Sequence, residues 1–162
     1  MSRLDGFIRR LTAQRRILDF VAQAIATTPG PVLELGLGNG RTYDHLRERL
    51  PGREIFVFER KLAAHPVCVP DAGHLILGDL RDTLPGALAR IGRPAALAHC
   101  DLGDGDLAAT AAFAAWLGPA LAPLLAPGAL VASDQPLDEP TLAALAPPDG
   151  VPPRRYYLYR RC

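Results

Sequence analysis

The sequence predicts an α/β fold: a doubly wound, mostly parallel sheet with helices on both faces. Three observations predict it. Apolar segments of strand length alternate with helix-length segments through most of the chain. The segment at 54–58 is apolar on both faces at its centre, as buried parallel strands are. A glycine-rich turn at 36–40 joins one strand to the next helix.

Strands are expected where short apolar runs lie between turn residues, and they cover 32–35, 54–58, 74–77, 95–100, 129–133 and 156–159. Helices are expected at 4–26, 42–50, 82–90, 106–125 and 140–145. Their candidate N-terminal caps include Thr42, Asp82 and Asp106. Pro119 and Pro123 are expected to bend or split the helix at 106–125.

The turn after the first strand carries glycine at alternate positions. It reads Glu-x-Gly-x-Gly-x-Gly from Glu34 to Gly40. Glycine lets the backbone turn sharply and approach a ligand, and the following helix points free N–H groups at the same place. A dinucleotide-binding turn needs Gly-x-Gly-x-x-Gly, whose third position here is Arg41. The spacing therefore favours a cradle for a ligand without a pyrophosphate.

This motif resembles the first motif of the class I S-adenosylmethionine-dependent methyltransferases. The resemblance covers about residues 31–134 and implies a Rossmann-like methyltransferase fold with S-adenosyl-L-methionine as cofactor. In that family the loop holds the amino-acid end of the cofactor, and the leading acidic residue helps bind its amino group. The cofactor-binding residues implied in this segment are Glu34, Leu35, Gly36, Gly38, Asn39, Gly40 and Thr42.

The resemblance also assigns residues at the ends of the next two strands. Glu59, followed by Arg60, is placed to accept both ribose hydroxyls, a device that nicotinamide-binding folds share. Asp79 and Leu80 match the positions that bind the adenine amino group and ring. A surface Glu59–Arg60 pair and a simple turn at Asp79 are the alternative interpretations.

The strand at 95–100 ends in a segment rich in carboxylates. In the family this loop lies beside the methyl group and the substrate, so Asp101 is the leading candidate for a catalytic residue that also contacts the cofactor. His99 is a second candidate, as a general base, although a buried structural histidine is the more common outcome.

Asp101 with Asp134 and Gln135 is similar to the metal ligands of catechol-type O-methyltransferases. Gln135 stands where that family has Asn, so we predict no metal site and interpret these residues as an acidic pocket mouth. The fold typically ends with a helix and an antiparallel strand pair. Only one strand is expected after Asp134, which predicts a shortened C-terminal end.

The chain of 162 residues suits a single domain, with a helical segment at 1–30, a cofactor-binding core at 31–134 and a short C-terminal part at 135–162. The formal net charge of +1 gives no electrostatic reason to expect nucleic acid as a partner. Arginines gather near both ends, and solvated faces explain them more simply than a phosphate-binding patch.

The three cysteines form no CxxC pair and no even set, which favours a reducing cytoplasm. The sequence shows neither a signal peptide nor an apolar run long enough for a membrane span. We therefore expect a cytoplasmic protein without a membrane partner. The N-terminal helix is expected to cover the pocket or to form a homo-oligomer contact, although packing in the core explains the same apolar stripe.

These features together predict an S-adenosylmethionine-dependent methyltransferase that acts on a small molecule. A non-catalytic protein that kept the cofactor cradle is one alternative. A nicotinamide-dependent oxidoreductase is another, but the third glycine and a recognisable catalytic set for that chemistry are missing.

Overall fold

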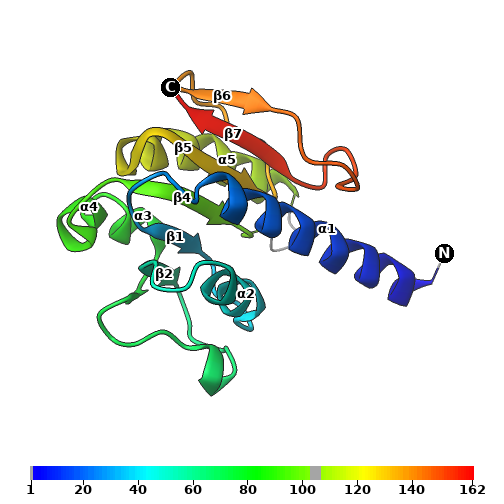
Figure 1. The fold of residues 1–162 in the computed structure, drawn as a ribbon, viewed down its shortest axis with the longest axis horizontal. Coiled ribbons are helices and arrows are strands. Elements are labelled where there is room, and N and C mark those ends of the chain that lie inside the picture. The colour runs from blue at the N-terminus through cyan, green and yellow to red at the C-terminus, as the bar shows by residue number, and fades with distance from the viewer. Residues whose placement is uncertain (1, 103–106) are drawn as a thin grey trace.

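The computed structural model describes residues 2–102 and 107–162 (Figure 1). Its helices are α1 (Arg3–Ala24), α2 (Arg41–Arg49), α3 (Leu80–Thr83), α4 (Ala87–Ile91) and α5 (Leu107–Leu121), with short 3₁₀ turns η1 (Pro66–Cys68) and η2 (Ala122–Leu124). Its strands are β1 (Val32–Leu35), β2 (Ile55–Glu59), β3 (Leu75–Leu77), β4 (Ala95–Cys100), β5 (Leu125–Ser133), β6 (Leu142–Leu145) and β7 (Tyr157–Arg161).

The strands of the described chain form one sheet in the order β3-β2-β1-β4-β5-β7-β6. Strands β1 to β5 pair in parallel, whereas β7 pairs antiparallel with both β5 and β6. The chain order reverses between β1 and β4, which are neighbours. In an open α/β sheet, the crevice at the carboxyl ends of such neighbours is where ligands bind. This architecture confirms the predicted fold class.

Helices cover both faces of the sheet, and each face has its own apolar core. Helices α1 and α2 pack on one face through residues such as Ile17, Val21 and Leu46, which meet Val57 and Leu97 of the sheet. The other face carries α4, α5 and the segment after α3, and its core includes Leu33, Phe58, Leu84, Ile91, Leu117 and Leu121. The N-terminal end of α1 projects past the sheet (Figure 1).

Two of the expected helix caps are wrong. The N-cap of α2 is Gly40, in a left-handed conformation, and Thr42 lies inside the helix with its hydroxyl turned to Glu34. Helix α3 is capped by Asp79, which accepts a hydrogen bond from Arg81 N at 2.9 Å, so Asp82 falls in the first turn rather than at the cap. Asp106 lies outside the described residues. Pro119 is accommodated inside α5, and the helix gives way to η2 before Pro123.

The expectation for the C-terminal end is also wrong in two respects. Residues 142–145 form strand β6 instead of a helix, paired with β7 in the register Leu142↔Arg161 to Leu145↔Leu158. Two strands therefore follow Asp134, and the antiparallel pair is complete. Between Ser133 and Leu142, all of which the structure describes, there is no helix. The C-terminal end is shortened by that helix and not by a strand.

No helix in the described part of the chain has the length and apolar character needed to cross a membrane.

Candidate functional site

The loop between β1 and α2 turns on three glycines with left-handed backbone. Gly36, Gly38 and Gly40 have φ values of 89°, 53° and 86°, which side-chain-bearing residues rarely adopt. A Cβ on Gly36 would lie 2.9 Å from Leu102 Cδ2, and one on Gly40 would lie 2.4 Å from Cys68 Cβ. A Cβ on Gly38 would meet nothing within 4 Å. Gly36 and Gly40 thus permit close packing of the loop, and Gly38 borders open space.

Glu34 is fully buried at the end of β1, and both of its oxygens are hydrogen-bonded. Thr42 Oγ1 donates to Oε1, and His99 Nδ1 lies 2.8 Å from Oε2. Burial disfavours the charged form of His99, but the neighbouring carboxylate of Glu34 outweighs burial and raises the pKa of His99. Glu34 therefore joins the first turn of α2 to β4 beneath the glycine loop.

Glu59, at the end of β2, holds the same loop from its other side. Its Oε2 accepts hydrogen bonds from Leu37 N at 2.8 Å and Gly38 N at 3.0 Å, and its Oε1 accepts from Lys61 N at 3.0 Å. Partial burial raises the pKa of Glu59, but these backbone donors outweigh it, so the pKa lies below its usual value. The carboxylate is ionised and fixed beside the loop.

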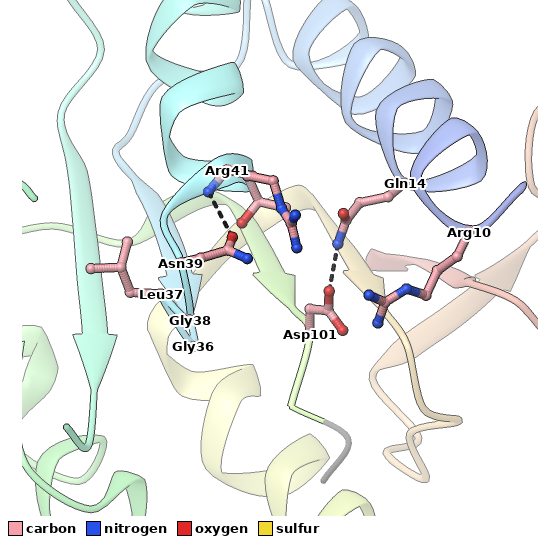
Figure 2. Close-up of a pocket in the computed structure, with 9 residues that line it drawn as sticks. Arg10, Gln14, Gly36, Leu37, Gly38, Asn39, Arg41 and Asp101 are labelled. Atoms are coloured by element: carbon pink, nitrogen blue, oxygen red, sulfur yellow. Dashed lines mark hydrogen bonds between the residues drawn. The ribbon is translucent and has the colours of Figure 1, made fainter. Parts of the chain in front are cut away.

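A pocket of about 210 Å³ opens between the glycine loop and α1 (Figure 2). Its lining combines loop residues with side chains from α1, the start of α2 and the end of β4: Arg10, Gln14, Gly36, Leu37, Gly38, Asn39, Arg41, Thr42 and Asp101. It lies at the carboxyl ends of β1 and β4, where the strand order reverses. Six of these residues belong to the segment 36–42, where the sequence predicted cofactor-binding residues.

Asp101 is the candidate catalytic residue that borders the pocket, where Gln14 holds it and Tyr156 in turn contacts Gln14. Gln14 Nε2 donates to Asp101 Oδ2 (Figure 2). It also donates to Tyr156 Oη at 3.0 Å. Burial raises the pKa of Tyr156, so its hydroxyl stays neutral. Gln14, Tyr156 and the pocket-lining Arg10 were not predicted from the sequence. Nothing in a single sequence brings together residues 87 and 142 positions apart.

His99 does not reach the pocket. Its side chain is 0% exposed, its ring stacks at 6.1 Å from that of Tyr156, and its Nδ1 is on Glu34. Among the described residues its Nε2 has no hydrogen-bond partner. This geometry favours a structural role for His99 over a role as a base acting on a ligand.

The remaining predicted residues lie around the pocket without lining it. Leu35 is fully buried, and its carbonyl accepts from Asp101 N at 3.4 Å. Arg60 and Asp79 are exposed, with Asp79 capping α3, and Leu80 is half-buried against the core. Asp79 and Leu80 directly follow β3, next to the end of β2 that carries Glu59.

Asp134 and Gln135 lie at the end of β5. Asp134 Oδ1 accepts a hydrogen bond from Leu102 N at 3.3 Å, and Asp134 Oδ2 accepts one from Gln135 Nε2 at 3.4 Å. Across residues 2–102 and 107–162, no group of three or more His, Cys, Asp or Glu side chains is arranged to hold a metal ion.

Comparison with known proteins identifies relatives of the whole chain. A family described as S-adenosyl-L-methionine methyltransferase matches residues 1–161. The crystal structure of an S-adenosyl-L-methionine methyl transferase from Silicibacter pomeroyi DSS-3 is 46% identical, with a TM-score of 0.93 over 100% of this chain and 99% of that chain. No curated protein matches the sequence.

More distant structures share the fold alone. Cofactor-bound Rv0187 from MTB is 17% identical, with a TM-score of 0.59 over 98% of this chain and 88% of that one. TrmN from Thermus thermophilus is 16% identical, with a TM-score of 0.58 over 90% of this chain but only 48% of that one. The full-length match to the family and the close relative agree with the glycine loop and its pocket: the chain belongs to the S-adenosyl-L-methionine methyltransferase family.

Proposed function

We propose that this S-adenosylmethionine-dependent methyltransferase methylates a small molecule, with Asp101 facing the reacting groups in the pocket beneath α1. The observation that carries the proposal is the pocket itself. It is about 210 Å³ in volume, lies between α1 and the glycine loop, and has a carboxylate fixed at its edge by Gln14. An acceptor that reaches Asp101 must share this pocket with the end of the cofactor.

The residues present fit the cofactor. Gly38 leaves open space where a side chain would otherwise occupy the pocket. The carboxylate of Asp101 suits a ligand end that carries an amino group and a sulfonium. Glu59 offers ionised oxygens beside the loop for the ribose hydroxyls. Asp79 and Leu80, which follow the neighbouring strand, are the candidates for the adenine.

Glu34 acts from beneath the loop in this proposal. Its side chain is buried against Thr42 and His99, so it supports the amino group of the cofactor through the position of the loop. Leu35, Gly36, Asn39, Gly40 and Arg60 contribute through the backbone and shape of the same two strand ends.

The bound cofactor supplies a methyl group that its sulfonium has already activated. The protein is left to align the acceptor, exclude water and accept a proton where the acceptor is a hydroxyl or an amine. Asp101 is placed for proton acceptance because Gln14 fixes one of its oxygens at the pocket edge. Gln14 and Tyr156 are positioning residues that act through Asp101.

Calorimetric titration tests the cofactor site. We expect S-adenosylhomocysteine and S-adenosylmethionine to bind and NAD not to bind, with or without magnesium. Gly38→Arg should abolish binding, because the new side chain enters the pocket. Gly52→Arg is the matched control: Gly52 also has a positive φ and open space around its Cβ, but it lies in a remote turn. If the Gly38 variant still binds the cofactor, the glycine loop is not part of the cofactor site.

A labelling experiment tests the acceptor. The protein is incubated with methyl-labelled S-adenosylmethionine and a cell extract separated into small molecules, RNA and protein. We expect label in the small-molecule fraction with the wild type and none with Gly38→Arg. Label confined to RNA or protein would refute the small-molecule acceptor and leave the methyltransferase activity intact.

A further inference from the structure

Two arginines at the mouth of the pocket have no role in the binding scheme described so far. Arg10 comes from α1 and Arg41 is the first residue of α2, yet both line the same pocket. We infer that they recognise an anionic group, a carboxylate or a phosphate, on the acceptor molecule. This inference rests on the proposed small-molecule function and adds the chemical class of the acceptor.

The two guanidinium groups converge on one side chain. Both lie over the ring of Phe7, with Arg10 Cζ 5.2 Å and Arg41 Cζ 5.6 Å from its centroid. Figure 2 shows Arg10 directed toward Asp101 across the pocket, and Arg41 directed into the space between the loop and α1. A cation–π contact at an exposed site is attractive and biases each arginine side chain toward this position.

Neither arginine has an ionic partner within the described residues. Other arginines on these elements do: Arg47 pairs with Asp44, and Arg49 with Asp19. Asp101, the carboxylate in the same pocket, is held by Gln14. Among the residues that line the pocket, two arginines without an ion-pair partner thus face one carboxylate.

The cofactor cannot neutralise this excess of positive charge. S-adenosylmethionine carries one carboxylate against an amino group and a sulfonium, so its net charge is +1 and loading it makes the site more positive. A second, negatively charged ligand restores the balance. Planar guanidinium groups match carboxylate and phosphate oxygens in geometry as well as in charge. An anionic acceptor is therefore the ligand that the loaded site favours.

Fluorine NMR provides a binding test that does not require the natural acceptor. The probes are 4-fluorobenzoate and its neutral counterpart 4-fluorobenzamide, each added to protein saturated with S-adenosylhomocysteine. We expect the benzoate to bind about tenfold more tightly than the benzamide and to be displaced by inorganic phosphate. Arg10→Gln and Arg41→Gln should each weaken benzoate binding about five- to tenfold. Arg9→Gln is the control, since Arg9 is an exposed neighbour on α1 that does not line the pocket.

Five results would overturn the inference, four of them in the binding of benzoate or RNA. The first is an absence of benzoate binding to the loaded wild-type protein, and the second is equal binding of benzoate and benzamide. The third is an equal loss of benzoate binding in the Arg9 and Arg10 variants. The fourth is tight binding of a labelled RNA oligonucleotide that all three variants weaken alike. S-adenosylhomocysteine is titrated into every variant first. If Arg10→Gln weakens that titration and not benzoate binding, Arg10 serves the cofactor, and the inference fails while the methyltransferase assignment stands.

Discussion

The buried pair of Glu34 and His99 links the chemistry of single residues to the stability of the fold. Thr42 and His99 each hydrogen-bond one oxygen of Glu34, and the Glu34 side chain raises the pKa of His99 despite the burial of the ring. A buried carboxylate without such partners is costly, because burial penalises its charge. The acidic residue of the glycine motif is thus compensated by a histidine 65 positions later in the chain.

This pair predicts how stability depends on pH. The folded-state pKa of His99 is raised above the value of about 6.5 expected in the unfolded chain. Its contribution to the free energy of unfolding is therefore fully present below pH 6.5 and is lost as the pH rises through the folded-state pKa, at up to about 1.4 kcal/mol per pH unit. The His99→Gln variant should lack this loss.

Urea unfolding of the wild type and of His99→Gln over a pH series measures the effect, with the difference between the two proteins as the readout. Every other ionisable group is shared by the two proteins, so contributions from those groups cancel in that difference. An identical pH dependence in the two proteins would show that folding does not raise the pKa of His99 and would contradict this prediction.

Helix α1 shows that the elements packed around a helix decide which of its apolar residues are buried. From Ala13 onward one face of the helix is buried against the sheet, whereas Leu4, Phe7 and Ile8 on its first turns are exposed. The apolar stripe in the sequence continues through both halves and does not reveal this division. Only the length of the helix relative to the sheet beneath it separates the core half from the half beside the pocket.

The two halves of α1 offer a matched pair of substitutions. Ile17 is 0% exposed and Ile8 is 53% exposed. Ile17→Ala should lower the free energy of unfolding by about 2–5 kcal/mol, because it removes buried methyl groups and leaves a cavity. Ile8→Ala should change it by no more than about 0.5 kcal/mol. Urea unfolding measures the free energy of unfolding of both variants. A comparable loss of stability in the Ile8 variant would mean that the exposed half of α1 is covered in solution.

At the level of elements, prediction succeeded where local signals and tertiary context agree. The strands at 32–35 and 95–100 were predicted to the residue, because both are apolar runs bounded by turn residues. Prediction failed at 142–145, where alanine and leucine favour a helix by propensity. Pairing with β7 overrides that propensity, and a partner strand that lies after a loop is not visible in a local pattern.

The candidate site is assembled from the whole molecule. Its pocket combines Arg10 and Gln14 of α1 with the loop after β1 and with Asp101 after β4, and Tyr156 supports it from the segment before β7. The sequence indicated the loop and Asp101, because strand ends and glycine spacing are local signals. It did not indicate Gln14, Tyr156 or Arg10, because their contribution depends on how α1 and the segment before β7 pack on the same face of the sheet.

This assembly predicts that cofactor binding stabilises the complete fold. A pocket built from such distant segments exists only in the native state, so its ligand binds folded and not unfolded chains. S-adenosylhomocysteine at about 100 times its Kd should add about 2.7 kcal/mol and, for a chain of this length, raise Tm by about 5–11 °C. Thermal unfolding followed by circular dichroism measures the shift. NAD at the same concentration should leave Tm unchanged, as should S-adenosylhomocysteine with Gly38→Arg. An equal shift with NAD would mean that the pocket does not discriminate between the two cofactors.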